Sequence, residues 1–274
     1  MALGPDDLVL CAATLAKVPL LERMEIAAAA GYTGLSLFLD DLEGLGIDDA
    51  ELRVRLDALG LEVGDLDPHL TWVPGVEAGG EGYQRWDTDD FLRAAKQVRA
   101  RSINAACFAP GVTFEQLVEP FRELCDRAAD AGLYVHLEFM PFAAIRDLDT
   151  AIALVDAAER DNAGIMFDVW HFVRSGSSRE TLAREAARVW AIQLDDCPAE
   201  PEANLVDETL HRRLMPGEGD ADVAGLIRIL DAGGCKAPLG VEIFSEELET
   251  MLPADAAKRA IDATRKVVAE ARGG

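Results

Sequence analysis

Four oxygen-bearing side chains in the second half of the chain stand at matching positions, each near the end of a short apolar run. They are Glu138 in YVHLEFM, Asp168 in GIMFDVWH, Gln193 in WAIQLDD and Glu242 in PLGVEIF. Three carboxylates and one amide oxygen suit a hard divalent ion, and Mg²⁺ and Mn²⁺ favour octahedral oxygen sites. The sequence therefore predicts one Mn²⁺ or Mg²⁺ ion on these residues, with Co²⁺ or Zn²⁺ as alternatives and with free positions for substrate oxygens.

The competing interpretation is that these four residues are separate polar groups whose hydrogen bonds are satisfied by loop backbone. One acidic residue at the end of one strand would favour that interpretation. Four such residues at equivalent positions on consecutive strands favour the metal site.

Other side chains near these positions are candidates for substrate contact. His69 and Trp72 follow the third strand-like run, in DLDPHLTW, and plain packing is the alternative for both. Trp170 stands two residues after Asp168 and could form a pocket wall or pack beneath a loop. Asp195 lies two residues past Gln193, on the same face of its strand, and could orient a metal ligand or bind substrate.

The elements that must position these residues alternate between strand and helix patterns along the whole sequence. Two long segments, 68–86 and 197–220, interrupt the pattern, and long loops in compact domains are often functional. Gly31 is expected to end the first helix as a C′ glycine. Strand-like runs cover 8–15, 33–39, 61–67 and 102–109 and the four runs that hold the metal ligands; helical patterns cover 19–30, 48–60, 87–100, 113–131, 147–160, 179–188, 221–232 and 253–271.

Eight strand–helix units with a repeat of about 30 residues predict an α/β protein with parallel strands. The economical arrangement is a single (β/α)8 TIM barrel formed by residues 1–274, in which strand ends converge on one face. An open doubly wound sheet is the alternative. Such a sheet usually has a glycine-rich loop after its first strand, whereas the segment ATLAKVP contains no glycine.

Composition narrows the function classes. The 274 residues include 50 Asp and Glu against 26 Lys and Arg, a formal net charge of −24, and this balance opposes nucleic-acid binding. Apolar runs are shorter than a membrane span, and the N-terminus does not resemble a signal peptide. Five scattered cysteines are expected to be reduced thiols. These features predict a cytoplasmic protein without a membrane or nucleic-acid partner.

Taken together, the segments LEFMPF, FDVWH, IQLDD, RRLMPGEGD and GVEIFS resemble the xylose isomerase-like TIM-barrel superfamily, the sugar phosphate isomerase/epimerase group. The resemblance covers essentially the whole chain and extends to ketose 3-epimerases, inosose dehydratases and 3-dehydroshikimate dehydratases. In that family Glu, Asp, His and Glu from the last four strands bind one divalent metal ion. Glu138, Asp168 and Glu242 take three of these places by resemblance. Gln193 stands where many relatives carry His, and some 3-dehydroshikimate dehydratases use Gln there.

The resemblance also implies roles for further residues. Glu138 and Glu242 would act as acid and base, His171 in the D-x-x-H spacing would touch a substrate oxygen, and Arg213 would bind substrate. A solvated loop charge is the alternative for Arg213, and Arg212 or His211 could take its place.

The expected activity is that of a metal-dependent isomerase or epimerase. It would remove a proton next to the metal-bound ketone of a sugar, keto-sugar or cyclitol, a polyhydroxy ketone. The first alternative is a lyase or dehydratase that eliminates a β-hydroxyl from a dehydroshikimate, inosose or 3-keto-glycoside. In that branch His171 would help the hydroxyl to leave, and Gln193 slightly favours it. A second alternative is a non-catalytic barrel that binds a sugar or a partner chain. Homo-oligomers are common in the group.

Overall fold

The computed structural model describes residues 3–78, 85–109 and 111–273. Eight parallel strands pair in sequence order, and β1 also pairs with β8, so that the sheet closes into a barrel. This arrangement confirms the predicted (β/α)8 fold. The strands are β1 (Leu8–Leu10), β2 (Gly34–Leu37), β3 (Glu62–His69), β4 (Ser102–Ala105), β5 (Tyr134–Glu138), β6 (Ala163–Asp168), β7 (Val189–Leu194) and β8 (Leu239–Val241).

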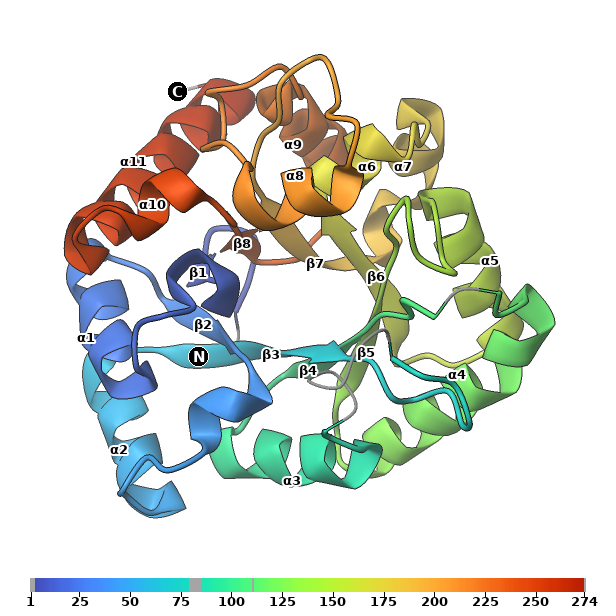
Figure 1. Ribbon diagram of the computed structural model, residues 1–274, viewed down its shortest axis with the longest axis horizontal. Helices are drawn as coiled ribbons and strands as arrows, with labels where there is room; N and C mark the ends of the chain where they lie inside the picture. Colours follow the sequence, from blue (N-terminus) through green and yellow to red (C-terminus); the bar gives the residue numbers. More distant parts are fainter. Residues whose placement is uncertain (1–2, 79–84, 110, 274) are drawn as a thin grey trace.

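Helices form a ring around the strands, and the last helix lies between the first helix and α9 (Figure 1). The α-helices are α1 (Leu20–Ala30), α2 (Asp49–Leu59), α3 (Thr88–Val98), α4 (Phe114–Asp130), α5 (Leu148–Ala158), α6 (Val169–Arg174), α7 (Arg179–Glu185), α8 (Leu205–His211), α9 (Val223–Ala232), α10 (Glu246–Glu249) and α11 (Pro253–Arg272). The described residues also form the 3₁₀ helices η1 (Ala12–Leu15), η2 (Leu39–Leu42) and η4 (Ala186–Arg188). None of these helices is long and apolar enough to cross a membrane.

The boundaries of several elements differ from the sequence prediction. Gly31 does end α1 in the left-handed conformation, with φ 97°, as predicted. The strand predicted over 8–15 stops at Leu10, because beyond it side chains take over the backbone hydrogen bonds. The Ala12 N–H donates to Ser36 Oγ at 3.0 Å, and Thr14 Oγ1 donates to the Val241 carbonyl at 2.8 Å. Two short helices, α6 and α8, lie in segments for which no helix was predicted. Residues 79–84 of the predicted 68–86 loop lie outside the described residues.

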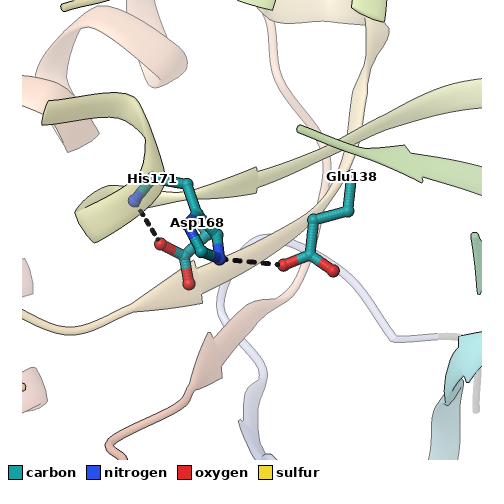
Figure 2. Close-up of side chains that lie close together, drawn as sticks. All are labelled: Glu138, Asp168 and His171. Atoms are coloured by element: carbon teal, nitrogen blue, oxygen red, sulfur yellow. Dashed lines mark hydrogen bonds and ion pairs between the residues drawn. The ribbon is translucent and has the colours of Figure 1, made fainter. Parts of the chain in front are cut away.

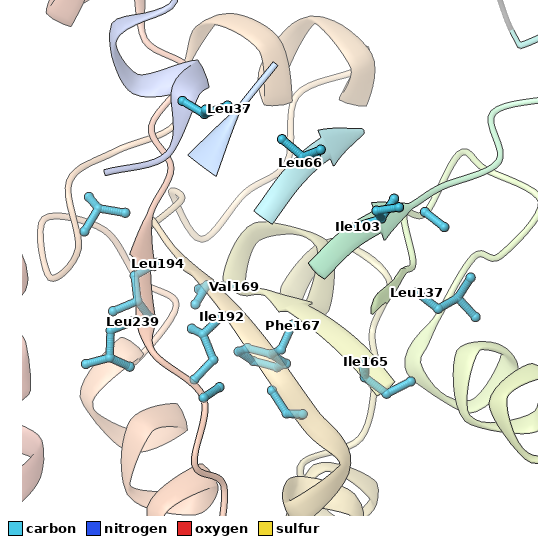
Figure 3. Packing of buried hydrophobic residues seen from close by; sticks show 14 of the residues in the cluster. Leu37, Leu66, Ile103, Leu137, Ile165, Phe167, Val169, Ile192, Leu194 and Leu239 are labelled. Atoms are coloured by element: carbon cyan, nitrogen blue, oxygen red, sulfur yellow. The ribbon is translucent and has the colours of Figure 1, made fainter. Parts of the chain in front are cut away.

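The apolar core lies between the barrel and the helices. Successive residues of a strand face opposite sides of the sheet. On β3, β4 and β5 one side of each strand carries Leu66, Ile103 and Leu137, which are fully buried in one cluster with Leu117 and Phe121 of α4 (Figure 3). The other side of the same strands carries polar residues that face the barrel interior. This alternation places polar side chains on the barrel axis and anchors their strands in an apolar shell.

Candidate metal centre

The four predicted metal ligands come to the same end of neighbouring strands. Glu138 and Asp168 are the last residues of β5 and β6, Gln193 is the penultimate residue of β7, and Glu242 directly follows β8. Asp168 pairs with Gln193 in the sheet register, and Gln193 pairs with Gly240. All four side chains are buried. The geometry therefore gathers them at the carboxyl end of the barrel, where (β/α)8 enzymes have their active sites.

Glu138, Asp168 and His171 form the part of the site drawn in Figure 2. Asp168 is the N-cap of α6, and its Oδ1 accepts the His171 N–H at 2.7 Å. This cap fixes the position of His171 relative to Asp168, because an N-cap side chain bonds the backbone three residues later. His171 Nε2 lies 3.5 Å from Glu138 Oε1. One possible ligand atom from each of the three residues lies within 4.8 Å of the others, a spacing that one metal ion can bridge.

The orientation of the Gln193 amide follows from its neighbours. Its Nε2 donates to Glu242 Oε1 at 2.9 Å and to Asp67 Oδ2 at 3.1 Å. Ionised carboxylates only accept hydrogen bonds, so the NH₂ group is assigned to the side that faces them. The Gln193 Oε1 atom is consequently left buried and has no hydrogen-bond partner among the described residues. A metal ion would satisfy this oxygen.

Buried carboxyl groups outnumber buried cations at this end of the barrel. Burial raises the pKa of Glu138 well above its usual range, and the charges of Asp67 and Glu242 add to the shift. Burial likewise raises the pKa of Glu242, although Arg213 opposes the change. Like charges brought together without water disfavour ionisation. A divalent cation would remove this repulsion, and together with the unpartnered Gln193 oxygen this shows that the residues fit a divalent metal ion.

Arg213 lies among the carboxylates and is itself buried. Its Nη1 donates to Asp168 Oδ2 at 2.6 Å, to Asp195 Oδ2 at 2.7 Å and to Glu242 Oε2 at 3.3 Å. Its Nε and Nη2 donate to Thr209 of α8, and the guanidinium carbon lies 5.9 Å and 5.2 Å from the ring centroids of Trp170 and Phe244. Each guanidinium nitrogen therefore has a protein acceptor, and Arg213 acts here as a fixed counter-charge.

Asp195 and Trp170, both predicted to touch substrate, support this arginine. Asp195 Oδ1 accepts the Trp170 backbone N–H at 2.9 Å, and its other oxygen accepts from Arg213. The Trp170 indole N–H donates to Glu208 Oε1 at 3.0 Å, and Arg174 donates to the same carboxylate. Trp170 is fully buried. These contacts tie α6 and α8 together beside the site, so that both residues form its wall.

The structure does not bring His69 and Trp72 to the metal centre, contrary to the expectation that they touch substrate. The His69 ring stacks on Phe91 of α3 with centroids 4.4 Å apart, and its Nε2 lies 2.9 Å from Thr88 Oγ1. The reason is a register shift between Leu66 and His69 in the pairing of β3 with β4, since such an irregularity changes which face the later residues occupy. Burial lowers the pKa of His69 to about 3.

Trp72 packs on the same outer side of the barrel. Its indole N–H donates to the Ala106 carbonyl at 2.8 Å, and its ring packs edge-on against Phe121 of α4, with ring centroids 5.7 Å apart. Both aromatic residues therefore attach the end of β3 and the following loop to the helices.

Two residues of the site, Asn104 and Asp67, were not predicted from the sequence. Asn104 Nδ2 donates to Glu138 Oε2 and to Asp67 Oδ1, both at 2.7 Å. Asp67 also accepts from Gln193. The signal that could have revealed them is a polar residue at every second position of two adjacent apolar strands, which places a polar row on the barrel interior.

Comparison with known proteins places the chain in one family of barrels. The sequence profile described as xylose isomerase-like TIM barrel matches residues 24–267. A 3-dehydroshikimate dehydratase of Pseudomonas aeruginosa is 25% identical over 237 residues, which are 82% of this chain and 36% of that protein, so the chain spans about a third of this relative's length. An inosose isomerase of Halalkalibacterium halodurans is 28% identical over 201 residues, 69% of this chain and 70% of that protein.

A crystal structure of the IolI protein with a bound zinc atom has the same fold. It superimposes with a TM-score of 0.87, covers 96% of this chain and 98% of its own, and is 22% identical.

Proposed function

Because the chain belongs to the xylose isomerase-like TIM barrel family, we propose that it is a divalent-metal-dependent isomerase or epimerase. Its substrate would be a sugar, keto-sugar or cyclitol with a ketone next to a hydroxyl group. The proposal is carried by two buried glutamates at the same end of the barrel. Glu138 ends β5 and Glu242 follows β8, and Gln193, whose Oε1 has no hydrogen-bond partner among the described residues, lies on β7 between them.

Glu138, Asp168, Gln193 and Glu242 would hold the ion. A bound divalent ion supplies Lewis acidity towards a carbonyl oxygen. The chain's own residues supply the remaining chemistry. Glu138 or Glu242 takes the proton next to the ketone, because each is a buried carboxylate at the carboxyl end of the barrel and a carboxylate held there can act as a general base. Return of the proton to the other face of the same carbon gives epimerisation, and return to the neighbouring carbon gives isomerisation.

His171 stands beside this pair and is uncharged, since burial lowers its pKa to about 4. Its Nε2 is near both Glu138 Oε1 and Arg213 Nη2. The imidazole can therefore exchange a hydrogen bond with Glu138 or with a substrate hydroxyl group.

A dehydratase on the same scaffold is the second candidate, and one observation favours it. The dehydratase of Pseudomonas aeruginosa matches 82% of this chain. In this reaction His171, whose Nε2 lies 3.5 Å from Glu138 Oε1, would take the abstracted proton from Glu138 and give it to the hydroxyl group, which leaves as water. Both candidates begin with the same proton abstraction. They differ in whether water is lost.

The test combines metal content with solvent exchange. Purified protein is analysed for bound metal, then incubated in D₂O with Mn²⁺ or Mg²⁺ and a panel of keto-sugars, keto-cyclitols and dehydroshikimate. We expect about one metal ion per chain and deuterium uptake into one substrate class. Glu138→Gln and Glu242→Gln should each abolish the uptake. Glu185→Gln, in a partly buried surface cluster with Arg184 and Arg188, is the control that should retain it.

The product mass then separates isomerase from dehydratase, because only the latter loses water. A protein that neither contains metal nor acquires it on incubation would refute the proposal and indicate a barrel used for binding alone.

A further inference from the structure

A continuous chain of hydrogen bonds runs across the barrel from one buried glutamate to the other. Glu138 Oε2 accepts from Asn104 Nδ2, and the same nitrogen donates to Asp67 Oδ1, both at 2.7 Å. Asp67 Oδ2 accepts from Gln193 Nε2 at 3.1 Å, and that nitrogen donates to Glu242 Oε1 at 2.9 Å. Strands β3, β4, β5 and β7 contribute one residue each, and Glu242 directly follows β8.

Asp67 is the central residue of this hydrogen-bond chain. One of its oxygens accepts from Asn104 and the other accepts from Gln193. Each amide nitrogen has two hydrogens, and both are directed at carboxylates. The carbonyl oxygens of Asn104 and Gln193 are therefore turned away from these carboxylates, and both are buried without a hydrogen-bond partner among the described residues. The direction of both amides is set by a residue that accepts from both at once.

We propose that Asp67 is a positioning residue: through Asn104 and Gln193 it holds Glu138 and Glu242 apart at fixed positions and leaves the Gln193 carbonyl oxygen free for the metal ion. This inference rests on the proposed function for the metal itself. Among the described residues, Asp67 forms its amide hydrogen bonds with Asn104 and Gln193 rather than with the glutamates. Its negative charge acts directly on Glu138 and Glu242, but its control over their orientation passes through the two amides.

The chemistry requires a carboxylate at this position. An asparagine side chain of the same size offers one acceptor oxygen and one NH₂ donor. It could accept from only one of the two amides, and the other amide would face a second donor. That amide must lose the bond or turn over. If Gln193 turns over, its NH₂ group takes the place of the oxygen that is available to the metal ion.

The experiment compares Asp67→Asn with Asp65→Asn. Asp65 lies two residues earlier on β3 and has almost the same exposure (7% against 6%). The comparison is made above the pKa of about 7 to which burial raises Asp67, so that each variant removes one negative charge. Its contacts are with Ser102 and His136 rather than with the two amides. Mn²⁺ affinity is measured by electron paramagnetic resonance of the free ion. The side-chain NH₂ signals of Asn104 and Gln193 are followed by NMR in metal-free protein, and Gln193→Glu identifies the Gln193 pair.

We expect Asp67→Asn to weaken Mn²⁺ binding by about 10- to 100-fold, the range for residues that orient metal ligands. At least one of the two NH₂ pairs should lose its protection from exchange with D₂O. Asp65→Asn should change the Mn²⁺ affinity by less than about threefold and keep both protected pairs, since it leaves the ligand-orienting contacts intact.

Equal Mn²⁺ affinity and equal amide protection in the wild type and Asp67→Asn would overturn the inference while leaving the proposed function intact. Equal losses in both variants would also overturn it, because they would indicate a general effect of charge. Absence of Mn²⁺ binding by the wild type would instead overturn the proposed function and the metal part of the inference. The amide signals would then decide whether Asp67 orients the two side chains.

Discussion

Replacement of Arg213 by methionine should destabilise the metal-free protein strongly, because three buried carboxylates would lose one shared cation. Arg213 is 3% exposed, and its Nη1 lies 2.6 Å, 2.7 Å and 3.3 Å from oxygens of Asp168, Asp195 and Glu242. Removal of one partner from a buried ion pair costs about 3–5 kcal/mol. We therefore expect the free energy of unfolding of Arg213→Met to fall by about 3–5 kcal/mol at pH 8.

The loss should depend on pH in a defined direction. Burial raises the pKa of Glu242 and Asp195, and Arg213 holds both pKa values down against that effect. Without the guanidinium the folded-state pKa values rise further above the unfolded values. A carboxyl with a raised folded pKa contributes stability that is present below the unfolded pKa and is lost as pH rises through the folded pKa. The difference between wild type and Arg213→Met should therefore grow from pH 5 to pH 8.

Urea-induced unfolding followed by circular dichroism, with a chelator present, measures both effects. The matched control is Arg212→Met at the adjacent position. The Arg212 side chain is 51% exposed and pairs with Glu202 and Asp207 at the surface, where ion pairs contribute about 0–1 kcal/mol. Equal losses in the two variants, or a difference that shrinks as pH rises, would refute the assignment of Arg213 as the counter-charge of the site.

Two further predictions concern Glu138 and Glu208. Burial raises the pKa of Glu138, so the metal-free protein should lose stability as pH rises above about 4.5 towards 8. Urea titrations should show that the free energy of unfolding of Glu138→Gln falls less steeply with pH than that of the wild type. An equal slope in the two proteins would contradict this. Glu208→Ala should lower the free energy of unfolding by about 3–5 kcal/mol, because Arg174 would stay buried without its carboxylate, and limited proteolysis should then cut first within 197–222. Asp207→Ala, at the exposed neighbouring position, should show neither change.

The sequence was sufficient to predict the barrel and the gathering of the four candidate ligands at one end of it, because both depend on patterns along single strands. Each of Glu138, Asp168, Gln193 and Glu242 follows its own apolar run, and parallel strands that close into a barrel bring their ends together. The Asp168-to-His171 spacing is likewise local, since the cap of α6 fixes it.

Contacts between distant segments could not be predicted in the same way. Arg213 follows α8, within a segment predicted to be a loop, and its three carboxylate partners lie on or next to β6, β7 and β8. Nothing in the local pattern indicates that the guanidinium is buried. The choice between packing and substrate contact for His69 could not be made from the sequence for a related reason. A register shift in the pairing of β3 with β4 turns its ring towards α3, and a bulge of this kind depends on how two strands pair.

The roles of Gln193 and Asp67 depend on each other, because the Gln193 amide donates a hydrogen bond to Asp67. A neutral imidazole that binds metal through one nitrogen has a single N–H left to donate. A histidine at position 193 could therefore hydrogen-bond to Asp67 or to Glu242 but not to both. The Gln193 amide has two hydrogens on one nitrogen, bonds both carboxylates and still presents an oxygen. An amide in the place of an imidazole would thus keep a neutral candidate ligand while linking Glu242 to the hydrogen-bond chain through Asp67, and the consequences of changing either residue should depend on the other.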